Sequence, residues 1–169
     1  MSETLITLAG IGNRSVGDDG ISLYLLETIQ DQLPDEIDVQ LWEDQDALSI
    51  AAELMEIQTP VVIVDCADMG LNSGEYRWFE ASECYLAQQV NSLSTHGFGF
   101  ADALALAQTL GFMQSVFFFA IQPEQLNFNE HISATLQNRQ MSMNHSLLQH
   151  LQQLMHQLMS QTVGGKINV

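Results

Sequence analysis

The sequence PVVIVD, residues 60–65, decides the fold class. Its four consecutive β-branched residues, Val61 to Val64, favour a β-strand. Because the run does not alternate between apolar and polar side chains, we expect both faces of this strand to be buried, as in the interior of a parallel sheet. The run ends in Asp65, so a carboxylate is expected at the carboxyl end of this strand.

Strands and helices alternate on both sides of this stretch. Strands are predicted at 5–9, 37–42, 75–80 and 115–121. Helices are predicted from Asp18 or Asp19 to 33, at 47–57, 83–91 and 97–110, and over the apolar stripe from 147 to 159. Ser94 or Thr95 is the predicted cap of the helix at 97–110. This alternation indicates an α/β fold, a three-layer sandwich with a mostly parallel sheet and helices on both faces. The chain of 169 residues is long enough to bury a core, and we expect one domain over residues 1–169.

Acidic residues dominate the charge of the chain. It has 21 Asp and Glu against four Lys and Arg, a formal net charge of −17. Nucleic acids and anionic membranes are bound through cationic side chains, so this charge argues against both kinds of partner. We favour solubility as the role of the charge, and a partner with a basic surface is the alternative.

Three further features predict a cytoplasmic protein. The longest apolar run, 116–121, is too short to span a bilayer. Residues 1–4 lack the cationic region of a signal peptide. Cys66 and Cys84 form neither a disulfide framework nor a CxxC site, which fits a reducing compartment.

The sequence GIGNRSVGDDG, residues 10–20, follows the first predicted strand. A G-x-G turn after a strand can bind a pyrophosphate at the N-terminus of the next helix. Here position 15 is Ser, and the helix opens with Asp18 and Asp19, whose negative charge opposes a phosphate. We therefore disfavour a nucleotide site. One carboxylate is enough to cap the helix, so we assign that role to Asp18 and keep Asp19 as a candidate metal ligand.

Asp65 and His96 complete a candidate site with Asp19. A carboxylate after an apolar strand carries a desolvation cost, and ligands in open α/β sheets bind beyond the carboxyl ends of strands. The alternative for Asp65 is a buried cap of the next loop, and for His96 alone it is a capping or surface imidazole. Two carboxylates and an imidazole suit a first-row divalent ion such as nickel, zinc or manganese. Three ligands also leave positions open for water or substrate.

The other histidines and cysteines are weaker candidates. His145, His150 and His156 fall on the last predicted helix, and we expect them to be solvated. His131 follows the loop after the last predicted strand and is kept as a fourth candidate for the same site. Cys66 is expected to be a buried structural residue on the opposite face of the strand from its neighbour. The chain has no G-x-S-x-G elbow and no indication of a Cys–His nucleophile pair.

Four segments carry a resemblance to a known family: GIGN at 10–13 with DDG at 18–20, VDCADMGLNSGE at 64–75, STH at 94–96 and IQPE at 121–124. The chain resembles the hydrogenase maturation endopeptidases, which process the large subunit of [NiFe] hydrogenases. The second segment is similar to the version in enzymes that serve the formate-hydrogenlyase hydrogenase. The resemblance covers roughly residues 5–135, in order and at comparable spacing.

This resemblance implies a twisted five-stranded sheet between helices, and an activity. The activity is that of an aspartic-type or metal-dependent endopeptidase, which makes one cut to remove a C-terminal extension of the large-subunit precursor after nickel insertion. The family's metal-binding residues fall on Asp19, Asp65 and His96. The nickel would arrive in the substrate, so no resident cofactor is expected. We expect the protein to be a monomer.

One segment departs from the family pattern. The family commonly carries Asp-Gly-Gly-Thr or a similar turn after the second strand, where this chain has WEDQD at 42–46. The glycines that allow a close approach of the backbone are absent. This departure favours one rival function, a non-catalytic, nickel-responsive binding or assembly protein on the same fold. A small-molecule hydrolase with a resident metal is a further alternative.

Overall fold

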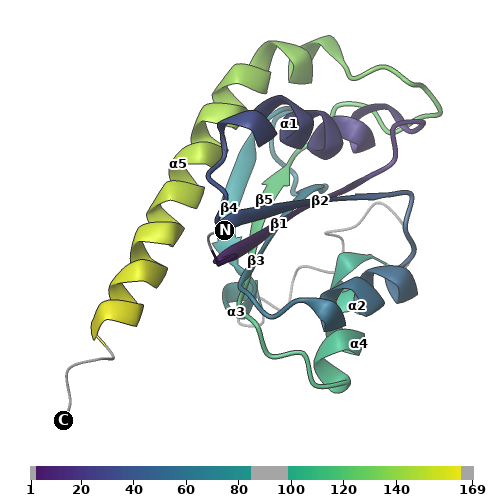
Figure 1. The fold of residues 1–169 in the computed structure, drawn as a ribbon. Helices are drawn as coiled ribbons and strands as arrows, with labels where there is room; N and C mark the ends of the chain where they lie inside the picture. Colours follow the sequence, from purple (N-terminus) through teal and green to yellow (C-terminus); the bar gives the residue numbers. More distant parts are fainter. Residues whose placement is uncertain (1–2, 85–98, 165–169) are drawn as a thin grey trace.

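The computed structural model describes residues 3–84 and 99–164. Strands and helices alternate along most of this chain (Figure 1). The elements are β1 (Ile6–Gly12), the 3₁₀ turn η1 (Gly17–Gly20), α1 (Ile21–Ile29), η2 (Gln30–Gln32), β2 (Ile37–Glu43), α2 (Ala47–Glu56), β3 (Val61–Cys66), β4 (Tyr76–Glu80), α3 (Ala81–Cys84), α4 (Phe100–Thr109), β5 (Val116–Ile121) and α5 (Ala134–Gly164).

One five-stranded sheet, with the strand order β2-β1-β3-β5-β4, organises the fold. β1 pairs in parallel with β2 and β3, and β3 pairs in parallel with β5, while the edge strand β4 runs antiparallel to β5. The apolar run Val61 to Val64 is fully buried in β3, as its composition predicts. The prediction of a mostly parallel sheet is confirmed.

Helices cover both faces of the sheet, as predicted for a three-layer sandwich (Figure 1). α1 and α5 pack on one face and α2 and α4 on the other. The helices that follow β1 and β2 therefore lie on opposite faces, and the strand order reverses between β1 and β3. The carboxyl ends of these two parallel neighbours lie at the same edge of the sheet, where ligands of open α/β sheets bind.

β1 is longer than the sequence predicts. It continues past Ala9 to Gly12, because its main chain stays paired with β2 as far as Glu43. Gly12 also allows η1 to approach the end of β1 closely. A Cβ atom at this position would lie 2.0 Å from the main-chain oxygen of Asp19. The glycine therefore brings η1 directly against the end of β1.

α4 begins later than predicted, at Phe100, with Gly99 at the N-cap. The Gly99 N–H donates to the Asp102 carboxylate at 3.1 Å, so the first turn of the helix supplies its own cap. The predicted caps Ser94 and Thr95 lie outside the described residues. So does most of the helix predicted at 83–91.

The long helix α5 carries the predicted apolar stripe toward the sheet. His150 stacks on Trp78 of β4, with ring centroids 4.7 Å apart and the planes at 4°. His150 is therefore half-buried and not fully solvated as expected, and this burial lowers the pKa of its imidazole. His145 and His156 are exposed, as predicted. Within the described ranges, no helix combines the length and the apolar character needed to cross a bilayer.

Candidate active site

A cavity of about 580 Å³ lies at the carboxyl ends of β1 and β3. Asp19, in the turn that follows β1, and Asp65, near the end of β3, both line it. Asp19 is only 1% exposed, and Asp65 is partly buried. The structure thus brings together two of the three predicted ligands, across 46 residues of sequence, at the point where the strand order reverses.

Main-chain contacts hold Asp19 in place. The Asn13 N–H donates to Oδ2 of Asp19 at 2.9 Å. The Asn13 side-chain amide donates to Oδ1 of Asp44 at 2.8 Å, which joins the turn after β1 to the turn after β2. The Ser22 hydroxyl donates to the Ile11 main-chain oxygen and fastens the start of α1 to the end of β1. The Asp19 carboxylate is therefore bound by the N–H of Asn13, whose side chain is tied to the turn after β2, and the start of α1 is tied to the end of β1.

Asp65 is an unusually basic carboxylate. Burial raises its pKa well above the usual value, the negative charge of Asp19 raises it further, and a hydrogen bond from the Cys66 N–H lowers it in part. That N–H donates to Oδ1 of Asp65 at 2.7 Å. When two neighbouring carboxyl groups bind protons with different strength, one can act as the acid and the other as the base.

Asp18 has a different environment from Asp19, although the two are adjacent. Its carboxylate is 0% exposed. Its oxygens accept the main-chain N–H groups of three residues in the segment between β5 and α5: Glu124 at 2.8 Å, Gln125 at 3.0 Å and Ser133 at 2.6 Å. The prediction that Asp18 caps α1 is wrong. The N-cap of α1 is Gly20, without a side-chain hydrogen bond, and Asp18 instead fastens a distant loop.

The turn after β2 adopts a glycine-like conformation without containing glycine. Asp44 has φ 52°, in the left-handed region that favours glycine and tolerates Asp. Its N–H donates to the Gly12 oxygen at 2.9 Å. Asp46 caps α2 by accepting the Ser49 N–H at 2.8 Å, and this hydrogen bond lowers the pKa of Asp46. The segment WEDQD therefore forms a defined turn at the cavity.

The cavity is acidic. Asp44 and Asp46 line it together with Asp19 and Asp65, and the described lining residues include neither Lys nor Arg. Arg14, the cation of the same turn, is bound elsewhere: its guanidinium lies 2.6 Å from the Glu27 carboxylate and 3.2 Å from that of Glu43. It also lies over the Tyr24 ring, 4.7 Å from the centroid. The arrangement suits a cation or a basic peptide.

The third predicted ligand, His96, lies outside the described residues. Gly99 and Phe100, the first residues of the second described stretch, line the cavity. In the two described stretches, 3–84 and 99–164, no three His, Cys, Asp or Glu side chains are grouped so that they could hold a metal ion. A metal site here therefore needs a ligand from outside these stretches or from a substrate.

Comparison with known proteins identifies the family. Residues 46–158, more than half of the chain, match the family model described as hydrogenase maturation protease (HycI). The chain belongs to the hydrogenase maturation protease family. The resemblance found in the sequence motifs is thereby confirmed.

Individual members of this family are distant relatives of the chain. The hydrogenase expression/formation protein HupD of Thiocapsa roseopersicina is 27% identical over 127 residues, which are 75% of this chain and 58% of HupD. The chain thus spans about three fifths of the length of the curated relatives it matches.

Solved structures of maturation proteases share the fold. The hydrogenase maturating endopeptidase HybD from E. coli has a TM-score of 0.73 at 19% identity, with 89% of this chain and 93% of HybD covered. The [NiFe] hydrogenase maturation protease HycI from Thermococcus kodakarensis KOD1 has a TM-score of 0.66 at 19% identity, with 89% and 94% covered. At these identities, the structures show a common fold.

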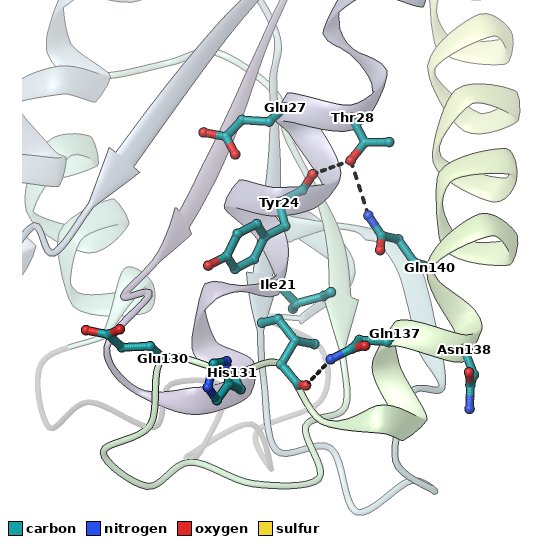
Figure 2. Close-up of a pocket in the computed structure, with 10 residues that line it drawn as sticks. Ile21, Tyr24, Glu27, Thr28, Glu130, His131, Gln137, Asn138 and Gln140 are labelled. Atoms are coloured by element: carbon teal, nitrogen blue, oxygen red, sulfur yellow. Dashed lines mark hydrogen bonds between the residues drawn. The ribbon is translucent and has the colours of Figure 1, made fainter.

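In this maturation-protease chain, the fourth candidate, His131, does not line the acidic cavity. It lines a separate groove of about 660 Å³ between α1 and the start of α5. Figure 2 shows the imidazole below Tyr24 and next to Glu130. The loop passes the cavity before it reaches His131, and it is Leu126 and Phe128 that line the cavity. Sequence analysis missed these two because an apolar loop residue carries no chemical signal.

Proposed function

We propose that this protein is an endopeptidase that removes the C-terminal extension of a [NiFe] hydrogenase large-subunit precursor after nickel insertion. The observation that carries the proposal is the pair Asp19 and Asp65, which line one acidic cavity in a chain of the maturation protease family. The similar HybD of E. coli is itself described as a hydrogenase maturating endopeptidase. We expect the protein to act as a cytoplasmic monomer.

The two carboxyl groups have different roles in the proposed reaction. Hydrolysis of a peptide bond needs one group to take a proton from water and another to give a proton to the leaving amine. Asp65 is the proton donor, because burial and the charge of Asp19 raise its pKa. Asp19 orients the water and accepts its proton. The products are a new C-terminal carboxylate on the large subunit and a free amine on the released extension.

The nickel ion belongs to the substrate in this proposal. The Asp19 carboxylate and the His96 imidazole are donors that a first-row divalent ion accepts while Asp65 holds its proton, and Asp65 becomes a third donor once it has given that proton to the leaving amine. Recognition of the metal would restrict cleavage to precursors that have already received it.

The conformation of Asp44 weakens the case for a non-catalytic rival. That rival was based on the missing glycines at 42–46. Asp44 takes the left-handed conformation that a glycine would favour, and its N–H donates to the Gly12 oxygen. The composition of the turn therefore gives no reason to infer a loss of activity.

The test is cleavage of a nickel-loaded precursor, followed by intact-mass spectrometry. The wild-type protein should release one C-terminal fragment from the nickel-loaded subunit and none from the nickel-free subunit. Asp65→Asn and His96→Ala should lower the rate at least about 100-fold. Asp35→Asn, a change of an exposed carboxylate before β2, is the matched control and should keep the wild-type rate. An intact cognate precursor after incubation, or full activity of Asp65→Asn, would overturn the proposal.

A further inference from the structure

Phe128 is a large apolar side chain left in solvent at the candidate active site. It is 94% exposed and lines the acidic cavity. Other large apolar side chains in the described part of the chain are also exposed, such as Met113 at 90%, but they do not line this cavity. Single exposed apolar residues are common on protein surfaces, so the position of Phe128 needs a second observation before it supports a role.

The second observation is that the loop bearing Phe128 is fastened on both sides of it. Before it, the Asp18 carboxylate accepts the Gln125 N–H, and the Asp18 N–H donates to the Gln125 oxygen at 3.0 Å. After it, the Gly17 N–H donates to the Asn129 oxygen at 2.6 Å. The Asn129 N–H in turn donates to the Ser15 oxygen at 3.1 Å. The backbone that presents Phe128 is therefore hydrogen-bonded to the turn that bears Asp19.

Close packing under the loop adds to this attachment. Gly17 has φ 55°, and a Cβ atom there would lie 2.9 Å from the Gln125 oxygen. Only a residue without a side chain lets the two segments approach so closely. An aromatic ring held by a fixed backbone loses little conformational entropy when a partner covers it. Such preformed aromatic contacts often provide much of the binding energy of an interface.

The surroundings of Phe128 define the chemistry of its partner. Leu126 of the same loop also lines the cavity and packs against the core under α1 and α5. The apolar surface therefore continues from Phe128 at the rim to the wall. The same cavity carries the charges of Asp44 and Asp46, without Lys or Arg among its described lining residues. A polypeptide with an apolar side chain close to a cationic one fits this surface.

We propose that Phe128 is a substrate-docking residue, which packs against an apolar side chain of the precursor polypeptide beside the scissile bond. This inference rests on the proposed function, because it takes the acidic cavity as the cleavage site. Phe128 contacts the substrate before and during cleavage equally, so it contributes to binding and not to the chemical step. Its removal therefore raises KM and leaves kcat unchanged.

Steady-state cleavage of the nickel-loaded precursor tests this role. Phe128→Ala should raise KM about tenfold, with kcat within about twofold of wild type, and Phe128→Leu should keep most of the affinity. Met113→Ala removes an equally exposed apolar side chain away from the cavity and should change neither constant. In the Asp65→Asn background, where cleavage is suppressed, Phe128→Ala should raise the Kd for the precursor by the same factor.

The possible results separate the two proposals. If the wild-type protein cleaves the precursor and Phe128→Ala has the wild-type KM and Kd, the docking role is overturned and the proposed function stands. An equal rise in KM for Met113→Ala also overturns it, because the effect would then be general to the surface. If the wild-type protein neither cleaves nor binds the precursor, the proposed function fails, and the docking role fails with it.

Discussion

Asp18 and Asp19 are adjacent, and both are almost fully buried in η1, yet they serve two different regions of the molecule. Asp18 turns to the segment between β5 and α5 and accepts three main-chain N–H groups. Asp19 turns to the cavity that it shares with Asp65. Successive side chains of a 3₁₀ turn point about 120° apart, which explains how neighbours reach different partners.

The electrostatic difference between the two regions indicates their roles. Around Asp18, main-chain dipoles point at the carboxylate and compensate its charge, so this region stabilises the fold. Around Asp65, burial and the charge of Asp19 oppose ionisation and raise the pKa. Such opposition is unfavourable for stability and is common at catalytic sites. Substitutions of Asp18 and of Asp65 should therefore have opposite effects on the free energy of unfolding.

The largest expected effect on stability comes from Asp18→Ala. The change leaves the buried main-chain N–H groups of Glu124, Gln125 and Ser133 without their acceptor. We expect the free energy of unfolding to fall by about 3 kcal/mol, as for the loss of one partner in a buried charged network. Urea denaturation measures it, with Asp35→Ala as the exposed control. A loss below about 1 kcal/mol would contradict a structural role for Asp18.

A smaller loss of stability is expected from a substitution of Gly12, where η1 meets β1. Gly12→Ala places a Cβ atom 2.0 Å from the main-chain oxygen of Asp19, so the backbone must move. Gly10→Ala in the same strand meets the Leu26 Cδ1 atom at 2.9 Å, and a side-chain end can move aside. We expect Gly12→Ala to lower the free energy of unfolding by about 2 kcal/mol and to reduce cleavage, and Gly10→Ala to do less of both.

Equal effects of the two alanine substitutions on cleavage would contradict the positioning of Asp19 by Gly12. Thermal melts and cleavage rates at a temperature where both variants are folded provide the comparison. The pair is informative because both positions lie on β1 and both changes add one methyl group.

The smallest stability effect, of opposite sign, is expected for Asp65→Asn. Because the pKa of Asp65 is raised in the folded protein, the folded state holds this proton at pH values where the unfolded chain, with its ordinary value of 3.8, has lost it. The contribution of Asp65 to the stability of the wild-type protein therefore falls as pH rises above about 4, through the raised pKa. Asparagine carries no charge, so the variant should be about 1 kcal/mol more stable at pH 7.

Urea denaturation from pH 4 to 8 checks this prediction. The gain in stability of Asp65→Asn over wild type should grow as the pH rises. A variant that is less stable at pH 7, or a difference that does not change with pH, would show that the Asp65 carboxylate is compensated in the folded protein.

Local patterns in the sequence predicted the layers of the fold and the place of two candidate site residues. The β-branched run Val61 to Val64 identified the central strand, because a continuous apolar run predicts burial on both faces of the sheet. The ends of parallel neighbouring strands meet at one edge, so Asp19 and Asp65 could be expected to approach. These inferences need no knowledge of distant contacts.

Contacts between distant segments were not predictable in the same way. The partners of Asp18 lie more than 100 residues away, and nothing near Asp18 distinguishes them from a helix cap. The stacking of His150 on Trp78 depends on how α5 lies across β4. Phe128 looks like any loop residue until the hydrogen bonds around it are known. Each of these features depends on tertiary packing, which composition and periodicity do not encode.

Cleavage of the nickel-loaded precursor by Asp18→Asn and Asp19→Asn, measured side by side per folded molecule, tests the division between the two carboxylates most directly. Asp19→Asn should keep a stability within about 1 kcal/mol of wild type and lose at least about 100-fold in cleavage rate. Asp18→Asn should melt at a lower temperature but, where it is folded, cleave within a few-fold of wild type. A cleavage-competent Asp19→Asn, or a stable and inactive Asp18→Asn, would contradict the account.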